Sequence, residues 1–285
     1  MSLPNRTHIA WQNDIAAFTL ASDVSAETEY PLTNMQNKIA NMPTVIDMTG
    51  ETTVEITFSS ATQRTANCFS LHRHNFPTGT TVQLVLYPDE SQGGTAEYDS
   101  TATEVEHSIP FDSIILGVDQ LEGSFESINN LTTNFSLWFD SVVYKSGKIV
   151  ITNDDGFTDD LLQVDKCYLA IAYCPEYGPE QNVRSTGIDG SEHRRKPGGG
   201  MDTVQREVRR ALDMNFKFVE NAERHVLRNI LGRAKMGGDL LITLDPNDAM
   251  SWKYETTSIY RRMNDVGFLA QFYNANDMAL SVEEN

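Results

Sequence analysis

The sequence predicts a mainly β protein, with an N-terminal β-sandwich or jelly roll followed by a C-terminal α+β domain. Three observations predict it. Short alternating apolar and polar segments recur over residues 1–175, separated by Gly, Pro, Asn and Asp. A stretch rich in Gly, Pro and charge follows at 176–200, which is typical of a linker or an extended arm. Residues 201–285 combine one long alternating segment with one segment of helical spacing, which indicates a helix packed on an antiparallel sheet.

The strands expected in the first part follow from alternation. Thr53–Phe58 places Val54, Ile56 and Phe58 on one face, and Thr81–Tyr87 does the same with its aliphatic residues. Lys148–Thr152 and Cys167–Cys174 are predicted as further strands. A polar stretch at about 91–140 interrupts the pattern, so we predict an insertion between two core strands there.

The second part is predicted to begin with a long strand over Val204–Phe218, one face of which is exposed to solvent. A helix is then expected to begin at Glu220 or Asn221 and to end at Lys235, before Gly237-Gly238. Its apolar residues, which fall at helical spacing, are Val219, Ala222, Val226, Ile230, Leu231 and Ala234. Leu240–Leu244 is predicted as a strand, Trp252–Met263 and Gly267–Tyr273 as a paired hairpin, and Met278–Val282 as the last strand.

Charge separates the two parts. Up to Arg184 there are 8 basic and 25 acidic residues, and from Ser185 onward 14 and 15, in a chain whose net charge is −18. The acidic first part argues against nucleic acid as a specific partner, because phosphates attract the opposite charge. The longest apolar run, Cys167–Cys174, has 8 residues, and a bilayer span needs roughly 20, so no membrane insertion is expected.

Several segments follow one another in a characteristic order: Tyr30–Asn34, Thr53–Phe58, His74–Val82, Tyr168–Ala172, Gly199-Gly200 with Arg206–Phe218, Asp245-Pro246, Trp252–Glu255 and Ser281–Glu284. This order resembles that of bacteriophage tail-tip or baseplate structural proteins, of the distal-tail or minor tail protein type, with an N-terminal discoidin-like jelly-roll module. The resemblance implies a structural, non-enzymatic role. It also implies that the part at 201–285 forms a symmetric trimer or hexamer ring, which connects the tail tube to other tail-tip proteins. Its location would be the virion, after synthesis in the cytoplasm of the bacterial host. A glycan-contacting jelly roll is also implied.

Candidate sites are few. Asp154, Asp155, Asp159 and Asp160 gather carboxylates in one segment and are a calcium candidate, because Ca²⁺ prefers oxygen ligands; a solvated acidic turn is the competing interpretation. His72 and His74 have the spacing of a metal pair but lack a visible third ligand. Basic residues are proposed as one side of a subunit interface that faces the acidic part of another copy: Arg194, Arg195, Arg206, Arg209 and Arg210.

No catalytic motif or cofactor motif is found, so the protein is expected not to be an enzyme. The first functional hypothesis is the structural tail-tip component. The alternative is a carbohydrate-binding module that recognises a cell-surface glycan. A tail-associated hydrolase is the third hypothesis, for which the sequence offers no site.

Overall fold

The computed structural model describes residues 6–37, 42–105, 134–179, 183–189, 191–195, 201–204, 208–235, 237–246, 257–265, 267–272 and 275–284. Within these ranges the protein consists of antiparallel strands, short 3-10 turns and one α-helix. The predicted fold class, a β-sandwich joined to an α+β part, is therefore confirmed. That helix is not long and apolar enough to cross a membrane.

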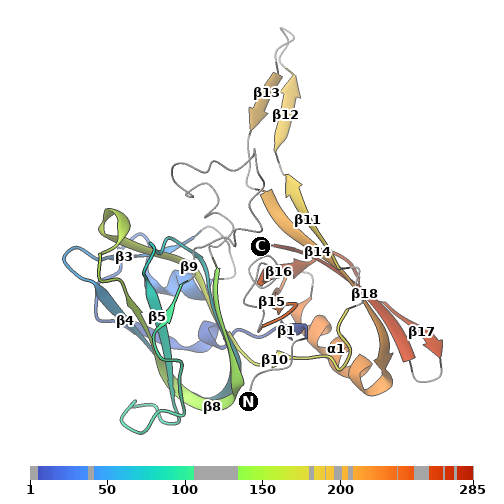
Figure 1. Ribbon diagram of the computed structural model, residues 1–285, viewed down its shortest axis with the longest axis horizontal. Coiled ribbons are helices and arrows are strands. Elements are labelled where there is room, and N and C mark those ends of the chain that lie inside the picture. Colours follow the sequence, from blue (N-terminus) through green and yellow to red (C-terminus); the bar gives the residue numbers. More distant parts are fainter. Residues whose placement is uncertain are drawn as a thin grey trace.

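The N-terminal sandwich is built around two long strands, β4 (Thr53–His74) and β8 (Asn134–Thr152). They pair antiparallel along their whole length, with register shifts between Ser59 and Arg64 and between Ala66 and Cys68. Figure 1 shows both strands curving round from one layer to the other. The shorter members of this sheet are β2 (Thr19–Ser22), β3 (Thr44–Asp47), β5 (Thr81–Tyr87), β6 (Tyr98–Asp99), β7 (Thr103–Glu104) and β9 (Leu161–Ala170).

The pairing assigns the halves of the long strands to two layers. β2 pairs with the first half of β4, and β5 with the second half of β8, which gives an outer layer. β9 pairs with the second half of β4 and with β3, which gives an inner layer. Apolar side chains of both layers form one core, which includes Ile56, Phe58, Leu84, Phe69 and Leu169. Two 3-10 turns, η1 (Asp14–Ala17) and η2 (Leu32–Gln36), contribute Ile15 and Met35 to it; a third, η6 (Thr158–Asp160), precedes β9.

A second sheet forms the C-terminal part. Its order is β10-β1-β15-β16-β18-β14-β11, with β17 also paired to β18. The bounds are β1 (His8–Ala10), β10 (Ala172–Tyr173), β11 (Arg184–Asp189), β14 (Val208–Glu220), β15 (Asp239–Thr243), β16 (Ser258–Arg262), β17 (Phe268–Phe272) and β18 (Ala275–Glu284). The helix α1 (Asn221–Ala234) covers one face of this sheet through Leu227, Ile230, Leu231 and Ala234.

The other face of the C-terminal sheet packs against the inner layer of the sandwich. Tyr168, Ala170 and Cys68 of that layer form one buried cluster with Leu241 and Ile259 of the sheet. The inner layer is therefore covered on both faces, and the molecule stacks three β layers and one helix. Strands that are buried on both faces lose the clean alternation of apolar and polar residues, which agrees with the almost continuous burial of β9.

The observed division of the chain differs from the predicted boundaries. β1 and β10 lie within residues 1–175 but belong to the C-terminal sheet. There β1 pairs with β10 on one side and with β15 on the other. In the predicted linker, Arg184–Asp189 forms the edge strand β11, paired with β14. The insertion predicted at about 91–140 ends earlier than expected, because residues from Asn134 onward belong to β8 and Phe135 and Phe139 are in the core. Residues 106–133 lie outside the described ranges.

Three local predictions were wrong. β16 and β17 do not form a hairpin, since each pairs with β18 at a different end. Phe218 is 58% exposed and has φ 58°, because the β14–β18 pairing is irregular between Phe216 and Val219. Val226 is exposed and Leu227 is buried in its place, whereas Ile230, Leu231 and Ala234 are buried as predicted.

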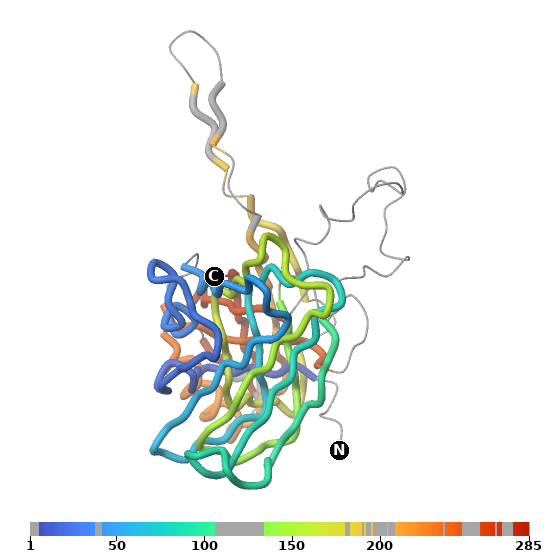
Figure 2. The backbone as a smooth tube through the Cα atoms, turned by 90° about the vertical axis from the view of Figure 1, so that its left-hand side faces the viewer, coloured from blue at the N-terminus to red at the C-terminus, as the bar shows by residue number. Residues whose placement is uncertain are grey.

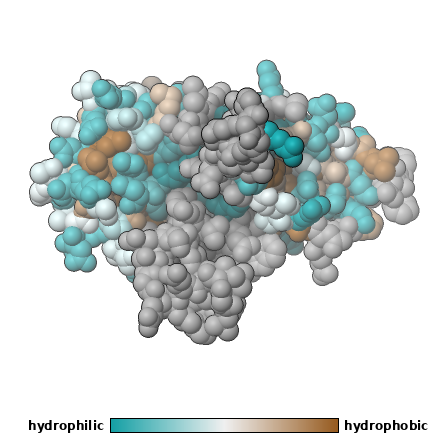
Figure 3. Space-filling model, turned by 90° about the horizontal axis from the view of Figure 1, so that it is seen from above, coloured by the Kyte–Doolittle hydropathy of each residue, from teal (hydrophilic) through white to brown (hydrophobic). Residues whose placement is uncertain are grey.

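A two-stranded ribbon extends from the body. It consists of β12 (Glu192–Arg195) and β13 (Met201–Val204), which pair antiparallel. Figures 1 and 2 show it projecting beyond β11 and β14 in two perpendicular views. Seen from above, the coloured surface is mainly hydrophilic, with separate small apolar areas (Figure 3).

Candidate functional site

The candidate site is a pocket of about 500 Å³ where the sandwich meets the end of α1. Three segments surround it: residues 11–13 with Ala16, the end of η2 with Asn37, and residues 233–235 with 237–239. Tyr168 of β9 also contributes to its wall. Since each segment comes from a different part of the chain, the pocket exists only in the folded molecule.

Two amide side chains fix the sandwich side of the pocket. Asn13 donates from Nδ2 to the carbonyl oxygen of Cys167 at 2.8 Å, and its Oδ1 accepts from the backbone N–H groups of Ile15 and Leu169. Gln36 donates from Nε2 to the carbonyl oxygens of Ile15 and Phe18, each at 2.7 Å. These amides tie the turn η1 to β9 and η2, so this wall is held before any ligand arrives.

Other side chains of the pocket are left to contact a ligand. The side chains of Gln12 and Asn37 line the pocket and make no hydrogen bond with the residues that the structure describes. An amide both donates and accepts, which matches the hydroxyl groups of a polyhydroxylated molecule. Trp11 lines the same pocket while packing partly against the C-terminal core. An indole ring beside free amides is suited to the apolar face and the hydroxyl edge of a sugar.

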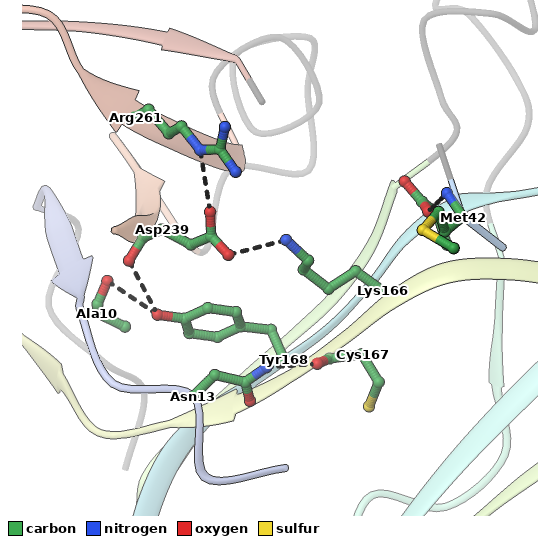
Figure 4. Close-up of polar contacts among 9 residues, drawn as sticks. Ala10, Asn13, Met42, Lys166, Cys167, Tyr168, Asp239 and Arg261 are labelled. Carbon is green, nitrogen blue, oxygen red and sulfur yellow. Dashed lines mark hydrogen bonds and ion pairs between the residues drawn. The ribbon is translucent and has the colours of Figure 1, made fainter. Parts of the chain in front are cut away.

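A partly buried group of ion pairs lies behind the opposite wall, where Asp239 lines the pocket. Asp239, the pocket's carboxylate, lies 2.8 Å from Nζ of Lys166 and 3.5 Å from Nε of Arg261. Figure 4 shows Asp239 between the two cations, with Tyr168 below it directing its hydroxyl towards the carbonyl oxygens of Ala10 and Asp239. Lys166 belongs to the inner layer, and Asp239 and Arg261 to the C-terminal sheet, so this group also joins the two parts.

The end of α1 supplies the remaining rim. Arg233 and Lys235 are exposed and line the pocket. The chain then turns back against the helix at Gly238, where a Cβ would collide with the carbonyl oxygen of Ala234. A glycine is therefore required there, and it brings β15 and Asp239 next to the helix end.

A second polar group is buried at the same junction but outside the pocket. Glu284 pairs with Arg210 at 3.1 Å and accepts from the hydroxyl of Ser258 at 2.6 Å. Burial alone would raise the pKa of Glu284, but the Arg210 guanidinium and the Ser258 hydroxyl outweigh it and hold that pKa below its usual range. His72 is buried, and its ring nitrogens have no hydrogen-bond partner among the described residues. Burial lowers the pKa of His72 to about 3, so its ring is neutral at physiological pH.

The predicted calcium residues do not form a cluster. Asp154, Asp155, Asp159 and Asp160 are exposed side chains around η6. Among the residues that the structure describes, no three His, Cys, Asp or Glu side chains are grouped so that they could hold a metal ion. His74 stacks on Phe76 at 4.0 Å, and its Nδ1 accepts from the backbone N–H of Phe76.

The arginines predicted for a subunit interface lie in different surroundings in the structure. Arg210 is 15% exposed in its pair with Glu284, whereas Arg209 pairs with Glu283 at 3.2 Å and is 56% exposed. Arg195 is exposed at the end of β12. Arg194 lies in the same strand, and Arg206 falls outside the described residues. The charge of Arg210 therefore serves the fold of this chain.

None of the pocket residues was singled out from the sequence. Trp11, Gln12, Asn37, Arg233 and Lys235 belong to no motif, and they converge only through long-range pairing. The one local indication was the Lys235 to Gly238 helix ending, which was predicted as a terminus and not as a site.

Comparisons with known proteins give a fold likeness only. No family model matches the chain, and a search of curated proteins finds no significant match. Among solved structures, a Ruminococcus gnavus GH29 fucosidase in complex with fucose matches 57% of this chain at 9% identity and TM-score 0.39. The chain spans 27% of that fucosidase.

Two carbohydrate-binding modules of Clostridium perfringens are matched over almost their whole length. The CBM32-5 module of CpGH89, in complex with GalNAc-β-1,3-galactose, matches 56% of this chain and 99% of the module, at 10% identity and TM-score 0.39. The family 32 module of NanJ, in complex with galactose, matches 57% and 98%, at 9% identity and TM-score 0.39. Likenesses of this degree do not bear on what this chain binds, so the function is argued from the pocket.

Proposed function

We propose that this protein is a carbohydrate-binding protein that holds a saccharide in the pocket between η1, η2 and the end of α1. The observation that carries the proposal is the set of side chains in one preformed cavity. Gln12 and Asn37 offer unengaged amides, and Trp11 offers an aromatic ring. The volume, about 500 Å³, is within the range of small-ligand sites, roughly 300–1,000 Å³.

The proposal is one of binding without turnover. Glycoside cleavage uses two carboxyl groups placed on either side of the scissile bond. Among the described lining residues the one carboxylate is Asp239, which is held by Lys166 and Arg261. A single carboxylate among the described lining residues does not provide the two carboxyl groups that this cleavage uses.

The test is a glycan array followed by calorimetric titration of the best saccharide. Gln12→Ala and Asn37→Ala should each weaken binding about three- to tenfold, the equivalent of one lost neutral hydrogen bond. Asn215→Ala, the same change at an exposed position of β14 away from the pocket, should leave affinity unchanged. Equal affinity in all three variants, or no binding to any glycan, would exclude the pocket as a sugar site.

A second candidate function is the structural one, a subunit of a phage tail tip that assembles as a closed ring in the virion. The projecting β12–β13 ribbon favours it, because an isolated two-stranded hairpin is only marginally stable in water. The outer edge strand β11 is exposed, with Ile188 at 40% and Val204 of the ribbon at 48% exposure. A neighbouring copy would cover both features.

Native mass spectrometry tests the structural candidate. The expected result is a discrete trimer or hexamer, and Arg194→Glu with Arg195→Glu should dissociate it if the ribbon contacts an acidic surface. A ring of unchanged mass in that double variant would rule out the charge contact, and a monomer at every concentration would contradict self-assembly.

A further inference from the structure

The pocket is a basic site in an acidic protein. The chain has a net charge of −18, yet the exposed rim of the pocket carries Arg233 and Lys235. Neither makes an ion pair or a side-chain hydrogen bond with any residue that the structure describes. Two free cations at the mouth of one cavity are what an anionic ligand requires.

The pocket's own carboxylate does not cancel this charge. Asp239 is shared by Lys166 and Arg261, at 2.8 and 3.5 Å. The negative charge of Asp239 is therefore already paired within the protein. Lys166 is only 3% exposed, so its charge is screened less by solvent than a surface charge would be.

The backbone at Lys235 gives a second, independent indication. Lys235 caps α1 with φ 53° and ψ −165°, a conformation that favours glycine and costs another residue about 1 kcal/mol or more. Glycines stand two and three positions later, at Gly237 and Gly238. A lysine at a position suited to glycine places a cation at the pocket mouth at the expense of stability.

The C-terminal end of α1 acts in the opposite direction, because it carries a partial negative charge. Part of it is already neutralised: the carbonyl oxygen of Leu231 accepts from the Lys235 backbone at 3.1 Å and from Nη1 of Arg262 at 3.2 Å. The full charges of Arg233 and Lys235 exceed what remains.

We infer that the pocket selects an acidic saccharide, a sugar that carries a carboxylate, over its neutral counterpart. This inference rests on the proposed function. The planar guanidinium of Arg233 can take a carboxylate through two parallel hydrogen bonds, and Lys235 adds a second positive charge. Gln12 and Asn37 would contact the hydroxyl groups.

The experiment compares methyl β-glucuronide with methyl β-glucoside, which differ only in the carboxylate at C6. Both are titrated into the full-length protein by saturation-transfer NMR or calorimetry, at low and at 0.5 M salt. The glucuronide should bind at least about tenfold more tightly, which corresponds to one charge-assisted hydrogen bond. Its advantage should shrink at high salt.

Three variants locate the effect. Arg233→Gln and Lys235→Gly should each remove most of the advantage of the glucuronide, and Lys235→Gly should also raise the melting temperature, since it relieves the strained cap. Arg228→Gln makes the same charge change on an exposed position of α1 outside the pocket, and it should have no effect.

The outcomes are separable. If the glucoside binds as tightly as the glucuronide and the variants change nothing, the preference for an acidic sugar is wrong while carbohydrate binding stands. If neither sugar binds and no other acidic or neutral glycan does, both proposals fail. A glucuronide preference that Arg228→Gln also abolishes would show net charge, and not this pocket, as its source.

Discussion

Gly147 of β8 lies where three other groups converge. A Cβ placed there would be 2.5 Å from Cζ of Phe58, 2.7 Å from the carbonyl oxygen of Val85 and 2.9 Å from Cδ2 of Leu86. Gly147→Ala should therefore destabilise the protein by about 1–3 kcal/mol through overpacking, measured by urea denaturation. Gly232→Ala is the control, because nothing lies within 4 Å of its Cβ in the exposed face of α1; it should stabilise by about 0.5–1 kcal/mol.

The single residue His72 makes the stability of the folded protein depend on pH. Its pKa in the folded protein is about 3, below the ordinary 6.5, because burial outweighs the attraction of Glu284, and the Arg73, Lys166 and Arg210 cations act in the same sense as burial. As pH falls below 6.5, the unfolded chain takes up this proton first. Stability is then lost from about pH 6.5 down to about pH 3, by up to about 1.4 kcal/mol per pH unit.

The variant His72→Gln isolates this contribution. Subtracting its stability-against-pH curve from that of the wild type should leave a slope confined to that window. A flat difference would mean that His72 can be protonated in the folded state without cost.

At the scale of elements, the contact between β9 and the C-terminal sheet depends on the Lys166–Asp239 pair. Asp239→Asn leaves the cation of Lys166, 3% exposed, without its partner. The expected loss is about 3 kcal/mol, which is typical of a broken buried pair. The control is Glu55→Gln, which breaks the Lys148–Glu55 pair of the same 2.8 Å length but with side chains 29% and 36% exposed. It should cost less than about 1 kcal/mol, and equal losses would contradict the role of burial.

The elements themselves were predicted unevenly. The sequence predicted β5 and the ends of α1 correctly, because alternation and the Gly237-Gly238 stop are local features. It did not predict that β4 continues for 22 residues, since Ser59–Arg64 is polar where the strand bends between layers. The pocket could not be predicted either, because Gln12, Asn37 and Arg233 come from separate parts of the chain that only the tertiary structure brings together.

At the scale of the whole molecule, the two parts are expected to unfold together. β1 lies between β10 and β15, so the C-terminal sheet contains chain from both ends of the sandwich, and the buried cluster around Tyr168 and Leu241 joins the layers. Differential scanning calorimetry should give one transition whose calorimetric and van't Hoff enthalpies agree. Two separated transitions would show that the sandwich and the C-terminal sheet are independent units.

The central claim is that the pocket beside Trp11 and Arg233 holds a saccharide. The most direct measurement is a crystal structure of the protein with the tightest-binding glycan from the array. The account predicts a sugar in this pocket, with its hydroxyl groups on the amides of Gln12 and Asn37 and, for an acidic sugar, its carboxylate on Arg233. A glycan bound only elsewhere on the sandwich, with this pocket holding water alone, would contradict it.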